Sequence, residues 1–349
     1  MIDYFDLPTE LCAVEPPEQR GLARDQVRLL VAQAAHNSHA RFADLPCFLS
    51  AGDLLVVNTS AALAADVTGQ WADGRDIAVR FSAMVADGTW LIDLLASSNA
   101  TPAHDPAVGD RIALPDGATV TLLGAHAVGG SARTRLWRAD VENDGSLEAY
   151  LARHGGPSYA SVRGRWPISA YRTVFGRDPG SAEMPSAGRP FTADLVASLV
   201  SAGVGVVPVT LHTAATDPDR QVPCPEWFQV PEATARLVNV TKAWGGRVVA
   251  VGTTAARALE TVACPDGRVV AATGWTDLVL GPHRQARVID GLITGWHPPG
   301  ASHLLMLEAV AGADLVAGAY REALSARYLW DGFGDSCLFL PPRRRLRAS

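Results

Sequence analysis

Three Asp-Gly pairs divide one stretch of this chain into short runs of strand-forming residues. They are Asp73-Gly74, Asp87-Gly88 and Asp116-Gly117, and all lie within residues 66–149. Runs such as residues 77–81 come between them and are rich in residues that favour strands. Asp-Gly between short strands is a strong signal for a tight hairpin. The pattern therefore predicts a small antiparallel β domain over residues 66–149.

The segments on either side follow a different rhythm, in which apolar strands alternate with helices. Before the β domain, the spacing of apolar residues predicts a helix over residues 26–35 and a buried strand over residues 53–58. After it, the chain predicts a helix over residues 193–201, a strand over 204–211 and a helix over 231–244. This alternation is typical of βαβ units around a mostly parallel sheet.

These two patterns predict a two-domain α/β protein. A large α/β domain, discontinuous in sequence, is expected over residues 1–65 and 150–349, with the β domain inserted into it. The chain has 349 residues, of which 48% are hydrophobic and 19% charged. That length suffices for two folded cores, and the composition is that of a globular protein.

The sequence also indicates in which cellular compartment the protein works. No uninterrupted apolar run approaches the roughly 18 residues that a membrane span needs. The first residues carry acids where a signal peptide needs cations. Five cysteines are scattered without Cys-x-x-Cys spacing, which argues against a disulfide framework or a zinc site. We therefore expect a cytoplasmic protein with no membrane partner.

A net charge of −6 argues against a broad nucleic-acid-binding surface but leaves room for a local basic groove. Two thin basic clusters are candidates for phosphate contacts, residues 163–165 with Arg172, and residues 343–347. A solvated loop and a solvated tail are the alternative interpretations of these clusters.

A strand, a glycine and the start of a helix follow one another at Val251–Glu260. Thr253 and Thr254 stand where the helix begins, so their hydroxyls and the first backbone N–H groups are available to polar or anionic ligand groups. Such turns also occur without a ligand. Three further blocks accompany this one in the chain: Pro185-Ser186-Ala187-Gly188, Val209-Thr210-Leu211-His212, and Thr294-Gly295-Trp296-His297-Pro298-Pro299.

The ordered set of blocks resembles the S-adenosylmethionine:tRNA ribosyltransferase-isomerase family of queuosine biosynthesis. That family has a Pro-Thr-Ala-Gly block, then Val-Thr-Leu-His, then Val-Gly-Thr-Thr-Ser-x-Arg-x-Leu-Glu, then Thr-Asn-Phe-His-Leu-Pro. The resemblance extends over nearly the whole chain, from Asp6 to Asp335. It implies a large α/β domain paired with a small antiparallel β-barrel.

The resemblance also implies a reaction. The ribosyl part of S-adenosylmethionine is transferred to 7-aminomethyl-7-deazaguanine in tRNA and isomerised to give epoxyqueuosine, with adenine and methionine released. A base must remove a proton made acidic by the sulfonium, and a donor must stabilise the leaving adenine. No metal or redox cofactor is expected, and the chain is expected to act as a monomer.

Three residues are candidates for proton transfer. His297 and His212 each follow an expected strand, and ligands bind at the carboxyl ends of strands in open α/β sheets. A hydrogen-bonded structural histidine is the alternative at each position. Glu226 matches a family glutamate and is a candidate base or ribose ligand through the resemblance.

Other matched positions are candidates for substrate binding, and some aromatic residues are candidates for stacking. The binding candidates are Asn58, Ser186, Gly188, Thr253, Thr254, Arg257 and Asp335. Trp227, Trp296 and Phe333 could stack on adenine or deazaguanine, although large aromatic residues more often belong to a core.

Several polar positions of the family pattern are replaced in this chain. Ala61 and Asp66 stand where two arginines are expected, and the aspartate reverses the charge. Pro190 and Cys224 each replace a histidine, and Gly295 replaces an asparagine. These changes leave two alternatives open. One is a divergent enzyme with a small-molecule acceptor such as a free deazaguanine, and the other is a non-catalytic nucleoside-binding protein.

Overall fold

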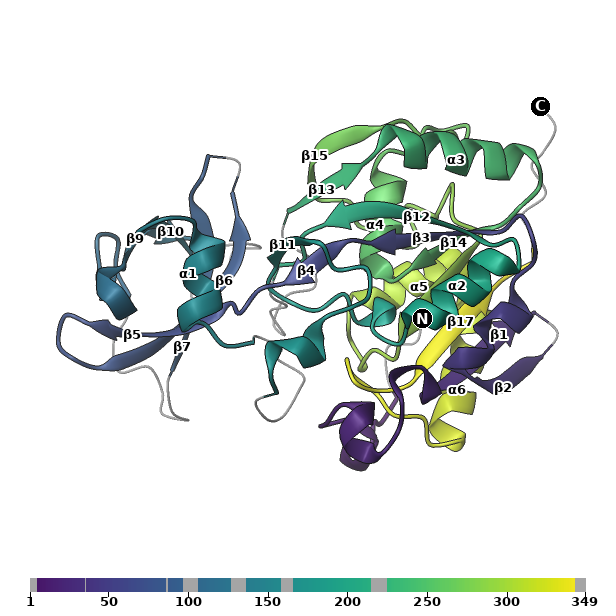
Figure 1. Ribbon diagram of the computed structural model, residues 1–349, viewed down its shortest axis with the longest axis horizontal. Helices are drawn as coiled ribbons and strands as arrows, with labels where there is room; N and C mark the ends of the chain where they lie inside the picture. The colour runs from purple at the N-terminus through teal and green to yellow at the C-terminus, as the bar shows by residue number, and fades with distance from the viewer. Residues whose placement is uncertain are drawn as a thin grey trace.

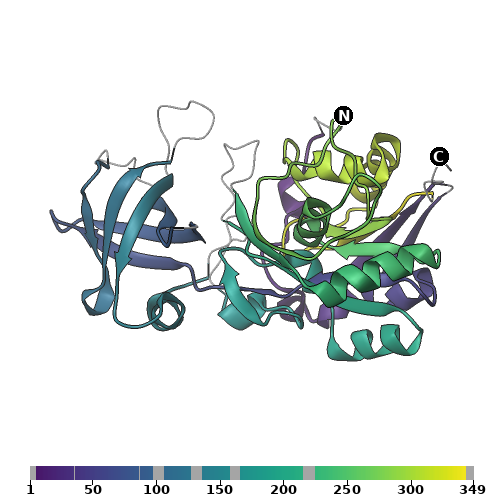
Figure 2. The same ribbon diagram turned by 90° about the horizontal axis from the view of Figure 1, so that it is seen from above.

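The computed structural model describes residues 5–34, 36–85, 87–96, 106–126, 136–157, 166–214 and 225–342. Figure 1 shows a closed barrel at one end of the molecule and a larger α/β body at the other. From above, Figure 2 shows the same two bodies side by side. The fold is the one expected from the sequence, an α/β domain with an inserted β-barrel.

A nine-stranded sheet forms the centre of the large body. In spatial order its strands are β15 (Ala272–Thr276), β13 (Glu226–Val230), β12 (Gly205–Leu211), β3 (Leu54–Asn58), β14 (Val248–Val251), β16 (Gly291–Gly295), β17 (Ser336–Leu340), β1 (Arg28–Gln33) and β2 (Asn37–Arg41). The four central strands from β12 to β16 are parallel. The carboxyl ends of these four strands therefore share one edge of the sheet.

Helices cover both faces of this sheet. They are α2 (Ala193–Ser201), α3 (Glu232–Ala243), α4 (Thr253–Thr261), α5 (His303–Ala311) and α6 (Ala313–Ser325). Helices α3 to α6 pack on one face, and α2 packs on the other together with the 3₁₀ helix η4 (Phe42–Phe48). The remaining 3₁₀ helices of this body are η1 (Thr9–Leu11), η2 (Pro17–Arg20), η3 (Arg24–Gln26), η6 (Ile168–Tyr171) and η7 (Ser186–Gly188).

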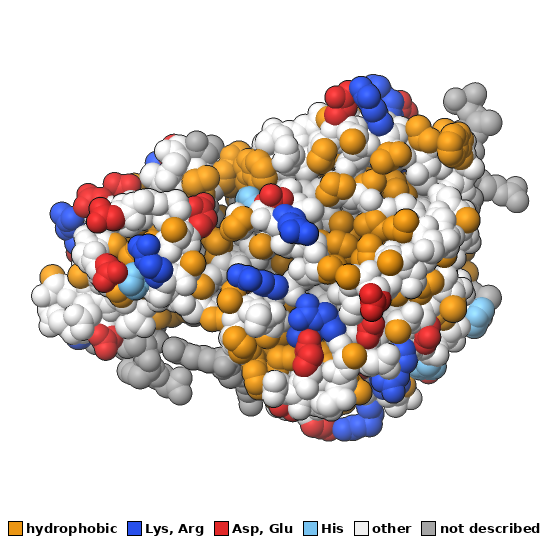
Figure 3. All heavy atoms as spheres, in the orientation of Figure 1, with side chains coloured by type: hydrophobic (Ala, Val, Ile, Leu, Met, Phe, Trp, Pro, Cys, Tyr) orange, Lys and Arg blue, Asp and Glu red, His pale blue; other side chains and the backbone are white. Residues whose placement is uncertain are grey.

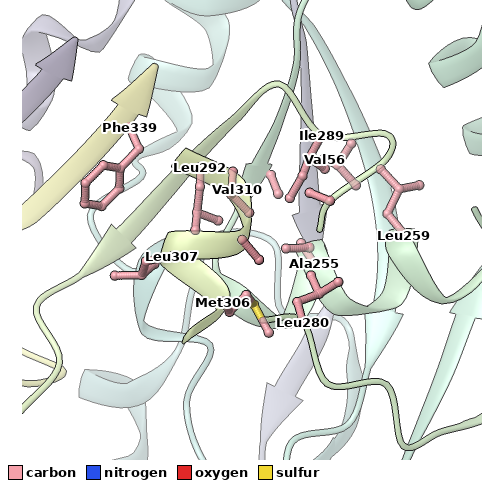
Figure 4. Packing of buried hydrophobic residues seen from close by; sticks show 14 of the residues in the cluster. Val56, Ala255, Leu259, Leu280, Ile289, Leu292, Met306, Leu307, Val310 and Phe339 are labelled. Carbon is pink, nitrogen blue, oxygen red and sulfur yellow. The ribbon is translucent and has the colours of Figure 1, made fainter. Parts of the chain in front are cut away.

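Apolar side chains from sheet and helices interlock in the core, as Figure 4 shows. Val56 and Leu292 of the sheet pack with Leu259 of α4 and Leu307 of α5 in a single buried cluster. Burial of such side chains contributes about 1.5–3 kcal/mol each to folding. This packing fixes the sheet edge against the first turns of α4 and α5.

One predicted helix is wrong. Residues 26–35 contain β1, which pairs with β17 on one side and β2 on the other. Leu30 faces one core cluster and Leu29 faces the other, and both are fully buried. A strand buried on both faces has a continuous apolar run with no alternation, which periodicity alone cannot separate from a helix.

The inserted domain is a closed antiparallel barrel. In spatial order its strands are β10 (Leu136–Glu142), β7 (Trp90–Ala96), β6 (Asp76–Met84), β5 (Asp66–Trp71), β8 (Arg111–Ala113) and β9 (Thr119–Ala125). The short η5 (Pro115–Gly117) and α1 (Leu147–His154) belong to the same body, and Tyr150 of α1 lies in the barrel core. Beside the barrel, β4 (Ser60–Ala62) pairs in parallel with β11 (Asp178–Ser181).

Among the described residues, no single helix is long and apolar enough to cross a membrane. Helices α5 and α6 pass the same criterion only when taken together, and the chain bends by 119° between them.

Candidate active site at the carboxyl edge of the sheet

The predicted site residues converge on the carboxyl edge of the central strands. Asn58 ends β3, Thr253 and Thr254 follow β14, and His212 follows β12. Thr294 and Gly295 end β16, which brings His297 to the same edge. The antiparallel neighbours add two more groups there. Glu226 opens β13, and Asp335 immediately precedes β17, whose Ser336 pairs with Gly295.

Asn58 connects three elements at this edge. Its Nδ2 donates to the backbone oxygen of Leu211 at 2.9 Å and to Thr254 Oγ1 at 3.1 Å. Its Oδ1 accepts from the backbone N–H groups of Leu211 and Ser60, each at 3.0 Å. The amide is buried, so these bonds use its polar atoms within the protein. The structure therefore supports a role for Asn58 in positioning Thr254 and β12.

The first turn of α4 lies at the centre of the edge. Gly252 precedes it with φ 91° and ψ 157°, and its N–H donates to Ile293 of β16 at 2.8 Å. A Cβ at Gly252 would lie 3.3 Å from the Cβ of Ala187 in η7, so the glycine allows a close approach. Thr253 and Thr254 are half-buried. The positive end of the helix dipole favours anionic ligand groups at this point.

Glu226 and Arg257 form a buried ion pair beneath this turn. Glu226 Oε1 also accepts from the N–H of Ala214 at 2.9 Å. Arg257 donates to the backbone oxygens of Leu278 and Thr276, each at 2.9 Å. Nε, Nη1 and Nη2 of Arg257 thus all donate to acceptors within the protein. These bonds hold the guanidinium in place, and it in turn orients the carboxylate of Glu226.

The environment of Glu226 suits proton transfer at neutral pH. Burial raises the pKa of Glu226 to about 7, and the carboxylate of Glu183 adds to the rise. Arg257 and the N–H of Ala214 act in the opposite direction. A base is most effective when its pKa lies near the working pH. Glu226 therefore has the properties of a general base.

His212 is held between the two strands that flank it. Its Nδ1 lies 2.8 Å from Ser60 Oγ, and its ring is stacked on Trp227 with centroids 4.9 Å apart. Gly180 of β11 approaches so closely that a Cβ there would lie 2.5 Å from the imidazole. Burial lowers the pKa of His212, although Asp178 opposes the shift. The ring is thus a neutral imidazole at pH 7 with a fixed orientation.

His297 is similarly fixed at the end of β16. Its Nε2 lies 3.0 Å from Thr294 Oγ1, and its backbone N–H donates to the Tyr320 hydroxyl at 3.3 Å. Its ring is stacked on that of His303, a residue that sequence reasoning missed. The available signal was weak, namely a second histidine six residues along, where a helix begins.

Two of the remaining binding candidates line a narrow recess beside η7. Ser186 and Asp335 both line it, together with Gly295. The Asp335 carboxylate accepts from the backbone N–H groups of Arg28 and Leu329, each at 2.8 Å, so it anchors the start of β1 and the loop at Leu329. Gly188 is buried in η7, and a Cβ there would lie at ordinary contact distance from Phe175 and Thr173.

Two of the three aromatic candidates belong to the core. Trp296 and Phe333 are only 2% and 1% exposed and pack in core clusters, and Phe333 also lines the recess. Trp227 is half-buried and stacks on His212.

Most of the substituted family positions can be located in the structure. Asp66 forms a two-pronged ion pair with Arg80 on the adjacent barrel strand, at 2.8 and 3.0 Å. Pro190 lines the recess, and a Cβ at Gly295 would meet no atom within 4 Å, so space remains where the family has asparagine. Ala61 lies on β4. Cys224 and the basic clusters 163–165 and 343–347 lie outside the described residues.

Comparisons with known proteins found relatives that are similar to nearly the whole chain. A relative from Symbiobacterium thermophilum is 35% identical, with 96% of this chain and 98% of the relative covered. One from Gloeobacter violaceus is 36% identical, with 98% and 96% covered. Both are named S-adenosylmethionine:tRNA ribosyltransferase-isomerase.

A solved structure and a family model point the same way. The crystal structure of an S-adenosylmethionine tRNA ribosyltransferase from Thermotoga maritima aligns with a TM-score of 0.54 at 27% identity, covering 97% of this chain and 99% of that one. The model of the family described as "Queuosine biosynthesis protein" matches residues 3–339. The chain therefore belongs to the queuosine biosynthesis protein family.

Proposed function

We propose that this chain is an S-adenosylmethionine:tRNA ribosyltransferase-isomerase. It transfers the ribosyl part of S-adenosylmethionine to 7-aminomethyl-7-deazaguanine in tRNA and isomerises it to epoxyqueuosine, releasing adenine and methionine. The observation that carries the proposal is the convergence of seven candidate residues at one sheet edge: Asn58, His212, Glu226, Thr253, Thr254, His297 and Asp335. These positions come from segments scattered between Asn58 and Asp335, and only the fold brings them together.

The chemistry needs a base that works beside a cationic sulfonium. Glu226 supports this role through its raised pKa and its fixed carboxylate. His297 and His212 supply neutral imidazoles, which can accept a proton and, once protonated, pass it to the departing adenine. Thr253, Thr254 and Ser186 are proposed to hold polar groups of the substrate. No metal or redox cofactor is required by this proposal.

A small-molecule acceptor is the second candidate, and one observation favours it. Four barrel arginines are each paired with a carboxylate on the barrel itself: Arg75–Asp73, Arg80–Asp66, Arg111–Glu142 and Arg138–Asp87. Figure 3 shows positive and negative side chains interspersed on the face of the barrel turned to the viewer. Paired cations attract RNA phosphates less strongly.

The experiment that tests the proposal is chromatography of the purified protein with S-adenosylmethionine, with and without tRNA carrying the aminomethyl-deazaguanine base. Adenine and methionine released only with that tRNA are the expected result. If adenine and methionine are also released with a free deazaguanine, or without any acceptor, then tRNA is not the required acceptor and that part of the proposal is wrong. Binding of S-adenosylmethionine by calorimetry without any release would instead support a non-catalytic nucleoside-binding protein.

Two further expectations remain proposals. The chain is proposed to act as a monomer, which light scattering of the active preparation would test. It is also proposed to work in the cytoplasm, where its tRNA substrate is found.

A further inference from the structure

His303 provides a second imidazole at the active edge, outside the blocks that carry the family resemblance. It is the first residue of α5. Its ring lies over that of His297 with centroids 4.5 Å apart and planes inclined by 3°. Rings in such close parallel contact fix one another, because rotation of either would drive its edge into the neighbour.

His297 is also held by hydrogen bonds, but these do not use both nitrogens of its ring. Its backbone N–H is held by Tyr320 of α6, and its Nε2 lies beside the hydroxyl of Thr294. Within the described residues, Nδ1 of His297 has no hydrogen-bond partner. The contact with Thr294 fixes one edge of the ring, and the stack with His303 fixes its plane.

We propose that His303 is a positioning residue for the ribosyl transfer: by stacking on His297, it keeps Nε2 on Thr294 and leaves Nδ1 free to exchange a proton with the substrate. The inference rests on the proposed function and deepens it. When Nε2–H donates to Thr294 Oγ1, Nδ1 has the lone pair. Nδ1 then accepts the proton that the attacking amine of the acceptor loses as its N–C bond to the ribosyl carbon forms, and the electron pair of the broken N–H bond stays on nitrogen. The proton on the carbon next to sulfur goes to Glu226, the proposed base.

The charges around the pair are consistent with this role. Burial, with help from the guanidinium of Arg257, lowers the pKa of His303 to about 4. Burial and the neighbouring His303 lower the pKa of His297 well below its ordinary value. The charge of Arg257 is itself paired with Glu226, and Tyr320 adds only a hydroxyl. Both rings are therefore neutral at pH 7.

The test compares H303A, which removes the stack, with H303F, which keeps a flat ring but no nitrogen. The full-length chain is used, and exposed His36 provides the matched control H36A. We expect H303A to lower kcat for adenine release by roughly 10- to 100-fold with little change in KM, because small misplacements of a reacting group are costly. H303F should stay within a few-fold of the parent, and H36A should match it. Thermal melting confirms that each variant is folded.

A second readout does not depend on turnover. Ring ¹⁵N NMR should show one tautomer of His297 in the parent and in H303F, and a mixture of tautomers in H303A. An unchanged His297 spectrum together with unchanged kcat in H303A would overturn the inference. So would H303F as inactive as H303A, because that result assigns His303 a direct chemical role. If the parent releases no adenine, the proposed function fails, and the NMR comparison still decides whether His303 positions His297.

Discussion

At the residue scale, the carboxylate of Glu226 sets the expected pH dependence of the reaction. A base acts only when ionised, and burial raises the pKa of Glu226 to about 7. We expect kcat/KM to rise with pH through that value. E226Q should remove this limb and lower kcat by about 10²–10⁴-fold, the usual contribution of a general base. Steady-state kinetics from pH 5.5 to 9 would measure both effects.

A control for Glu226 is available in Glu183, whose charge contributes to the raised pKa. E183Q keeps the base and should move the acidic limb to lower pH without a comparable loss of kcat.

Glu226 also makes the stability of the folded protein depend on pH. Because the folded-state pKa of Glu226 is raised, the parent loses stability as pH rises from about 4.5 to about 7, and E226Q should flatten that part of the profile. If the rise of kcat/KM with pH persists unchanged in E226Q, that rise belongs to the titration of another group.

At the element scale, the approach of α4 to η7 depends on Gly252. Its backbone, with φ 91° and ψ 157°, lies in a region that only glycine adopts without strain, which costs another residue about 1–3 kcal/mol. A new Cβ would also press on Ala187 at 3.3 Å. G252A should therefore lower the melting temperature and raise KM for S-adenosylmethionine, because it moves Thr253 and Thr254 relative to Ser186.

Gly312 provides a control position for the prediction on G252A. It has nearly the same backbone, φ 86° and ψ 146°, and a Cβ there would meet no atom within 4 Å. It lies beside Gln33 at the opposite edge of the sheet, away from the candidate site. G312A should lose comparable stability and keep the parental KM. Equal KM values in the two variants would show that the contact between α4 and η7 does not shape the site.

The elements also show what the sequence could predict. Turn residues and strand–helix alternation identified both domains, because those signals are local. Strand β1 was not recognised, because its identity depends on β17, which joins the sheet about 300 residues later. The pairing of Arg257 with Glu226 and the stack of His303 on His297 were missed for the same reason, since side-chain orientation comes from packing.

At the scale of the whole molecule, Asp66 stands where the chain enters and leaves the barrel. Its backbone exchanges two hydrogen bonds with Gly156, at 3.0 and 2.8 Å, and its carboxylate holds Arg80. The side chains are 27% and 12% exposed, so the ion pair is partly shielded from solvent. The family pattern has arginine at this position, and the pair gives the reversed charge a structural role at the junction of the two bodies.

A charge swap tests both roles of this position. D66R places two arginines directly opposite each other, because residues 66 and 80 are register partners, and should cost roughly 1 kcal/mol. The swap D66R/R80D should recover most of that stability and return a cation to the family position. We then expect tighter tRNA binding, with a salt dependence steeper by about one unit of slope on a log–log plot. The exposed pair Asp87–Arg138 supplies the control swap D87R/R138D. If D66R/R80D binds tRNA no better than this control, position 66 does not face the RNA, and the barrel's contribution to acceptor recognition lies elsewhere.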